Sequence, residues 1–162
     1  MRVLLAAFFS MVPCLAFAAW NTLIDDDIFS GGKTALMVGE IDPGSSLAID
    51  CKSSGEISIA YIEKSSSDDI DEGAAFRLLI KIDDQPTIEF SGRLERRNEK
   101  YIEITSSDRD LAIQAVKEIA SARRKILVGV SRLDGDSKHS ASAGAAGSSK
   151  AAAKLVKACN IQ

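Results

Sequence analysis

Apolar and polar residues alternate most clearly over residues 46–62. A large apolar residue or a cysteine occupies every second position in 47–51 and again in 57–61. An alternation of period two places the apolar side chains on one face of a β-strand. The residues between the two runs, Ser53-Ser54-Gly55, favour a turn. The pattern therefore predicts a β-hairpin that buries one face.

Six further segments carry the pattern of a strand. They are residues 33–38, 75–83, 87–95, 101–105, 126–130 and, more weakly, 140–143. Gly92 interrupts the third of these and is a candidate β-bulge. Residues 20–29 are interpreted as a short segment with an acidic run, closed by Ser30-Gly31-Gly32, and no strand is assigned to them. The predicted strands keep one polar face, as antiparallel sheets permit.

Two segments change to helical spacing. Apolar side chains recur through residues 107–120, after a Ser107-Asp108-Arg109-Asp110 start that resembles a capping box. In that interpretation the Ser107 hydroxyl accepts a hydrogen bond from the backbone N–H three residues further along. Residues 150–159 form the second predicted helix, with Cys159 facing inward. The chain is therefore expected to be α+β, with an antiparallel, sandwich-like sheet of seven or eight strands and two helices.

The N-terminus has the pattern of a secretory signal peptide. Arg2 precedes an uncharged apolar stretch, and Ala16-Phe17-Ala18 is a small-x-small cleavage site. The predicted organisation is a signal peptide over residues 1–18 and a single periplasmic or secreted domain over residues 19–162. An uncleaved membrane anchor is the alternative, which Pro13 and the cleavage site disfavour. A lipoprotein signal is disfavoured because proline precedes Cys14.

Export changes how the cysteines are interpreted. Cleavage removes Cys14 and leaves Cys51 and Cys159, which are expected to pair because the compartment is oxidising. A bond across a loop of about 100 residues stabilises the fold by about 4–5 kcal/mol in the chain-entropy model. Two buried free thiols are the alternative. A zinc site is disfavoured because the cysteines lack local ligand spacing.

The charge of the chain excludes some partners. Removal of Arg2 takes the formal net charge from −3 to −4, with both signs mixed along the sequence. Nucleic acid would require a basic face, and an anionic membrane a polybasic segment. We therefore expect neither nucleic-acid binding nor stable membrane insertion after cleavage.

Two patterns resemble ligand sites, and each has a plainer interpretation. Gly31-Gly32-Lys33-Thr34 ends like a phosphate-binding loop, but Asp27 stands where that motif needs its first glycine. The acidic runs at 25–27 and 68–72 have the oxygen ligands that calcium prefers. The EF-hand pattern fails because its twelfth position is Leu36. Solvated acidic turns are the default interpretation.

No catalytic constellation stands out. His139 is the single histidine, lies among small polar residues and is expected at the surface, and the chain has no G-x-S-x-G motif. Acids are plentiful, but no pair is singled out for sugar hydrolysis. We therefore predict a non-enzymatic protein with no catalytic residue, no cofactor and no metal.

Four residues are candidate contacts for a protein partner. Trp20, the single tryptophan, is of the type enriched at interface hot spots. Its alternative role is to pack under the sheet and hold the N-terminus. Arg93, Arg96 and Arg97 form a basic cluster that would suit an acidic partner, with a solvated strand end as the alternative.

The order of these features resembles two families of small exported bacterial proteins. An early tryptophan and Asp27-Ile28-Phe29 are followed by a strand that ends in Cys51, and a Gly147-Ser148-Ser149-Lys150-Ala151 helix closes on Cys159. This order is similar to the invasion-associated locus B proteins and to the VasI/TagO-like proteins associated with type VI secretion. The resemblance implies a disulfide-tied, β-rich envelope module without known catalytic residues. Ala141 and Ala143 depart from the bulky apolar residue usual before the last helix.

These expectations define two functional hypotheses. The first is a non-enzymatic envelope protein that mediates protein–protein interaction, as a secretion- or virulence-associated accessory. The alternative is an inhibitor of a cell-wall-degrading enzyme such as lysozyme. In that case the acidic loop 64–73 would enter a basic catalytic cleft.

Overall fold

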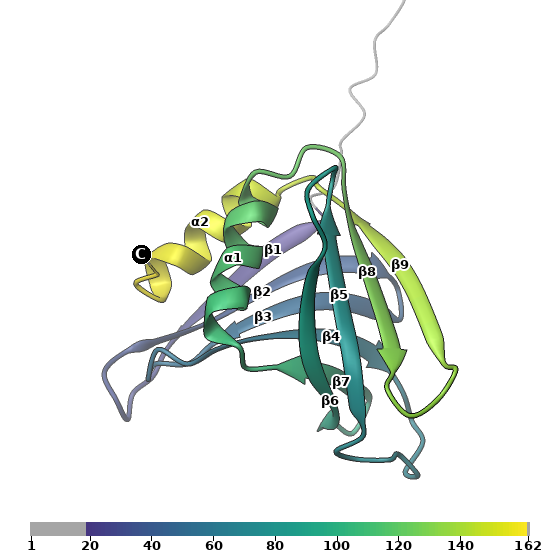
Figure 1. Ribbon diagram of the computed structural model, residues 1–162. Coiled ribbons are helices and arrows are strands. Elements are labelled where there is room, and N and C mark those ends of the chain that lie inside the picture. Colours follow the sequence, from purple (N-terminus) through teal and green to yellow (C-terminus); the bar gives the residue numbers. More distant parts are fainter. Residues whose placement is uncertain (1–18, 162) are drawn as a thin grey trace, which may run out of the picture.

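The structure, a computed structural model, describes residues 19–161. Nine strands form one antiparallel sheet in the order β1-β2-β3-β4-β7-β6-β5-β8-β9 (Figure 1). The strands are β1 (Trp20–Asp26), β2 (Lys33–Asp42), β3 (Ser45–Cys51), β4 (Ile57–Lys64), β5 (Ala75–Ile82), β6 (Ile88–Asn98), β7 (Tyr101–Ser106), β8 (Lys125–Arg132) and β9 (Lys138–Gly144). The helices are α1 (Arg109–Ala120) and α2 (Ser148–Ala158).

The sheet curls, so its last strands cross the direction of its first strands (Figure 1). The inner faces of all nine strands share one hydrophobic core with both helices. Helix α2 packs on β1 and β2, and α1 packs on β4, β5 and β6. The α+β class with two helices is thus observed. The single curled sheet of nine strands does not confirm a sandwich of seven or eight.

The additional strand is β1, which the sequence pattern did not reveal. Trp20 and Thr22 are buried on its inner face, whereas Leu23 and Ile24 are exposed. A threonine on the buried face and a leucine on the exposed face obscure the alternation on which strand prediction depends. Pairing with β2 in regular register, from Trp20↔Gly39 to Asp26↔Lys33, nevertheless makes the segment a strand.

The predicted 46–62 hairpin is confirmed as β3 and β4. The strands pair in register from Ser45↔Glu63 to Cys51↔Ile57. Leu47, Ile49 and Ile59 are fully buried. Gly55 has a φ of 84°, a conformation that glycine adopts without steric cost, and its N–H donates to Lys52 O to close the turn.

The prediction of a β-bulge at Gly92 is wrong. Gly92 lies in regular register opposite Phe76, and the irregularity of β6 falls between Arg96 and Asn98. A Cβ atom at Gly92 would lie 2.9 Å from Cγ2 of Ile104, so close packing explains the glycine there.

The first helix begins with a different cap from the predicted one. Asp108, not Ser107, is the N-cap, and its Oδ1 accepts a hydrogen bond from Leu111 N at 3.1 Å. Aspartate and serine are about equally good caps, so composition alone does not separate two adjacent candidates. The helix buries Ala112, Val116 and Ile119, the side predicted from the spacing.

The predicted disulfide joins Cys51 to Cys159, across 108 residues of sequence. It fixes the C-terminal end of α2 to the end of β3. Residues 1–18, which hold the predicted signal peptide, lie outside the described residues.

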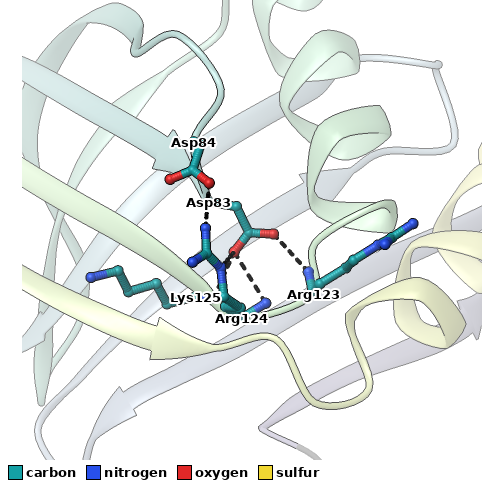
Figure 2. A network of polar contacts seen from close by, with 5 residues as sticks. All are labelled: Asp83, Asp84, Arg123, Arg124 and Lys125. Carbon is teal, nitrogen blue, oxygen red and sulfur yellow. Dashed lines mark hydrogen bonds and ion pairs between the residues drawn. The ribbon is translucent and has the colours of Figure 1, made fainter.

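One carboxylate organises the connection between α1 and β8 (Figure 2). Asp83, at the end of β5, accepts hydrogen bonds from the backbone N–H groups of Arg123 at 2.8 Å, Arg124 at 3.1 Å and Lys125 at 3.0 Å. These bonds, with that from Lys125 foremost, lower the pKa of Asp83. Its neighbour Asp84 forms an ion pair with Arg124. The network holds the end of β5 to the start of β8.

Candidate functional site

The described surface exposes five large apolar side chains, and four of them lie in the first hairpin. Ile28 and Phe29, in the turn between β1 and β2, are 85% and 94% exposed, and Leu23 and Ile24 on β1 are 55% and 40% exposed. Leu133, the fifth, lies apart in the β8–β9 turn. We call Leu23, Ile24, Ile28 and Phe29 the apolar hairpin. Single exposed apolar residues are ordinary, whereas a contiguous group of them marks an interaction surface. Ile28 and Phe29 are adjacent in the turn, whereas Leu23 and Ile24 lie on opposite faces of β1.

The turn that carries Ile28 and Phe29 is held by Asp27. Its Oδ1 accepts from Phe29 N at 3.0 Å, and its Oδ2 accepts from the hydroxyls of Ser30 at 2.7 Å and Ser53 at 2.6 Å. The bonds from Ser53, Ser30 and Phe29 lower the pKa of Asp27 to about 2. Because Ser53 belongs to the β3–β4 turn, Asp27 joins two neighbouring turns. The apolar hairpin is therefore presented in a fixed conformation.

The apolar hairpin was not predicted from the sequence. The acids of residues 20–29 dominate the segment, and Ile28 and Phe29 entered only through the family resemblance. The available signal was an apolar pair between Asp27 and Ser30-Gly31-Gly32. Turn residues normally face water, so a large apolar pair in a turn indicates either a core contact or an exposed binding group.

Trp20 is 2% exposed, which places its indole inside the fold. Its Nε1 donates to Gly144 O at 2.7 Å, and its backbone N–H donates to Ala146 O at 3.3 Å. These bonds link β1 to the end of β9, which are the two edges of the sheet. The arrangement matches the alternative role predicted for Trp20, that of holding the N-terminus.

The three candidate arginines take different environments. Arg97 lies between Asp50, at 2.8 Å and 3.1 Å, and Glu103. The hydrogen bonds to Asp50 are the main cause that raises the pKa of Arg97. Arg96 donates to Ser67 O in the 65–74 loop, and Arg93 is exposed. The charge of Arg97 is thus matched by two carboxylates rather than presented alone.

Arg97 also lines a polar groove of about 560 Å³ on the outer face of the sheet. Glu95 and Glu103 face each other across β6 and β7 in this groove. Like charges in that position repel, and Arg97 offsets the repulsion through its ion pair with Glu103. The pairing with Asp50 then ties β6 to β3 across two intervening strands.

His139 is exposed, as expected, and its ring lies 6.0 Å from the ring of Tyr61. Near Tyr61, Ser45 Oγ donates to Asp42 Oδ2 at 2.6 Å. This bond is the main cause that lowers the pKa of Asp42, whereas burial raises the pKa of Tyr61. The serine hydroxyl donates directly to the carboxylate, so the group lacks the Ser-to-His hydrogen bond on which nucleophile activation depends.

Residues 19–161 hold no group of three or more His, Cys, Asp or Glu side chains placed to bind a metal ion. Within the same residues, no helix has the length and apolar character needed to cross a membrane. No protein-family model, curated protein or solved structure matches this chain.

Proposed function

We propose that the protein is a non-enzymatic binding module of the bacterial envelope, which contacts a protein partner through the apolar hairpin. The observation that carries the proposal is that, of the five large apolar side chains exposed among residues 19–161, four fall within residues 23–29. Phe29 supplies an aromatic anchor of the kind enriched at interface hot spots. Asp27 fixes the turn before binding, which reduces the entropy lost on association.

Placement in the envelope rests on the sequence pattern of residues 1–18 and on the disulfide. Disulfides persist in oxidising compartments and are rare in the cytosol of mesophiles. A role as a secretion- or virulence-associated accessory follows from the resemblance stated above and remains a proposal.

Site-specific photo-crosslinking in the producing cell tests the binding surface. A photo-reactive amino acid replaces Phe29 in one variant and Leu133 in a matched control, because Leu133 is exposed but isolated. We expect one discrete adduct from position 29 and none from position 133. Equal adducts from both positions, or no adduct from position 29, would contradict the proposal.

The partner recovered in that adduct then permits a quantitative test. The combined substitutions Ile28→Ser and Phe29→Ser are expected to weaken binding by about thirtyfold, because a lost hot spot costs about 2 kcal/mol. Both side chains are exposed in the free protein, so the free energy of unfolding should stay unchanged. If the partner is a cell-wall-degrading enzyme, turbidity of a cell-wall suspension will show whether the protein inhibits it.

A further inference from the structure

We propose that the protein forms a symmetric dimer through β9, whose free edge pairs antiparallel with β9 of a second copy. The inference goes beyond the proposed binding role and does not depend on it. It is carried by the open edge of β9, by the small side chains along that edge and by a register in which the strand complements itself.

The first observation is the direction of the β9 backbone groups. Arg132 N donates to Ser137 O at 3.1 Å, and Ala145 N donates to Arg124 O at 3.2 Å. Hydrogen bonding to one neighbour alternates along an antiparallel strand, so the odd-numbered residues of β9 bond to β8. The residues that direct their N–H and C=O groups away from β8 are Lys138, Ser140, Ser142 and Gly144.

These groups point to a side of β9 on which residues 19–161 supply no neighbouring strand (Figure 1). The inner face of β9 crosses β2, where Ala143 is buried. Gly144 O accepts from Trp20 Nε1, whereas Lys138, Ser140 and Ser142 are exposed. A row of exposed backbone groups is a template for another strand.

The second observation is that β9 lacks the devices that usually protect an edge strand. It contains no proline and no bulge, and its one lysine stands at its first position. Residues 140–142 are small, so the backbone of another chain can approach closely. The other edge of the sheet is covered, because α2 packs on β1 and both Trp20 and Thr22 are buried.

The third observation is the register that the strand offers to a copy of itself. In a symmetric pair the position of the two-fold axis sets the register. An axis at Ser140 places Ser140 opposite its own copy and Lys138 opposite Ser142 of the second copy. All three free residues are then paired with one another. Every other axis pairs at least one of them with a residue outside the group, and an axis at Lys138 would also bring two lysines together.

The same register brings opposite charges together at both ends of the pairing. Gly144 lies beside Lys125 of β8 and, on its other side, opposite Asp136 of the second copy. Lys125 and Asp136 are exposed, and neither takes part in an ion pair among residues 19–161. Two strand spacings are about 10 Å, which these side chains can span over a glycine. This complementarity favours a second copy over an unrelated strand.

Dimerisation through β9 leaves the apolar hairpin free. The turn between β1 and β2 lies at the left of Figure 1, and β9 lies at the right. The dimer therefore presents two apolar hairpins on one particle. Two linked sites raise the avidity for a partner that offers repeated sites.

Sedimentation equilibrium of the purified, oxidised protein tests the pairing. Ser140→Pro removes the central N–H, which faces away from β8, so the bonds to β8 remain. We expect this variant to dimerise about thirtyfold more weakly, because each dimer loses two N–H donors. Ser140→Ala keeps the N–H and should dimerise as the unaltered protein does. A protein that stays monomeric up to about 1 mM, or equal dimerisation by Ser140→Pro, would overturn the proposal.

A charge reversal provides a test that leaves the β9 backbone unaltered. Lys125→Asp and Asp136→Lys each place like charges opposite each other at both ends of the pairing, so each should weaken dimerisation. Combining the two substitutions should restore it. Glu99→Lys makes the same change in charge at an exposed site elsewhere and should have no effect. A combined variant as weak as the single variants would overturn the register.

Disulfide coupling separates the remaining alternatives. Ser140→Cys should join two copies, because paired residues lie about 5.5 Å apart, whereas two copies of Ser142→Cys lie about 13 Å apart along the strands. Coupling at 142 and not at 140 would overturn the register. A dimer lost in Ile28→Ser/Phe29→Ser but kept in Ser140→Pro would assign dimerisation to the apolar hairpin. A photo-crosslink from position 142 to another protein in the producing cell, without a dimer, would assign the β9 edge to that protein.

Discussion

At the scale of single residues, the closure of the sheet depends on one close contact. A Cβ atom built at Gly39 would lie 2.4 Å from Cζ2 and 2.5 Å from Cε2 of Trp20. Only glycine leaves room for the indole ring, whose Nε1 donates to Gly144 O. The tryptophan and the glycine are therefore one structural unit, although they lie in different strands.

The substitution Gly39→Ala should consequently destabilise the protein. Forcing the indole out of its position is overpacking, which typically costs about 1–3 kcal/mol. Urea unfolding followed by tryptophan fluorescence measures the change. Gly129→Ala is the matched control, because a Cβ there would lie 3.6 Å from Leu79 Cβ, an ordinary contact. A loss at position 129 as large as that at position 39 would contradict the steric explanation.

At the scale of elements, the Asp27 carboxylate couples the β1–β2 and β3–β4 turns. Its pKa of about 2 lies below the ordinary value of 3.8, because the folded protein supplies hydrogen bonds to the charged form. A lowered folded-state pKa contributes stability that is fully present above pH ~4 and is lost as the pH falls towards 2.

The unaltered protein should therefore exceed Asp27→Asn in stability at pH 6, with the difference disappearing as the pH falls from about 4 to 2. The Phe29 amide, which donates to Asp27, should titrate with a midpoint near pH 2 in NMR spectra. Asp25→Asn removes a nearby charge without removing this hydrogen bond and serves as the control. A Phe29 midpoint near 3.8 would show that the carboxylate is free.

The sequence predicted most elements, because most of them have one buried face. Segment 75–83 alternates clearly and is observed as β5, and helical spacing revealed both helices. The pattern indicates which side of a strand is buried but not which strand lies beside it. The pairing of β4 with β7, while β5 and β6 lie beyond them, depends on contacts distant in sequence. One curled sheet and a sandwich therefore share the same local pattern.

The candidate site was less predictable than the fold. Exposure of Ile28 and Phe29 depends on the absence of a covering element, which no local pattern reports. Trp20, in contrast, was predicted as either a contact or a packing residue, and burial favours packing.

At the scale of the whole molecule, the disulfide and Trp20 close the fold at two places. Trp20 joins the two edges of the sheet, and Cys159 joins the last helix to β3. Helix α2 buries Ala151, Ala152 and Leu155 in the common core, so packing also holds it. Helix α2 is therefore held both along its buried face and at its C-terminal end.

Reduction of the disulfide should lower the free energy of unfolding by about 2–5 kcal/mol, because a bond that spans 108 residues restricts the unfolded chain. Comparing the oxidised and reduced forms of one sequence changes only the bond, whereas Cys51→Ala/Cys159→Ala also removes buried sulfur.

Native-state hydrogen exchange shows which part of the protein loses stability when the disulfide is reduced. If the disulfide acts by restricting the unfolded chain, its reduction should lower the protection of amides that exchange through global unfolding, such as that of Ile59 in β4. The amides of α2 should lose protection too. Loss confined to α2, without a change in global stability, would instead identify the disulfide as a local clamp on the helix end.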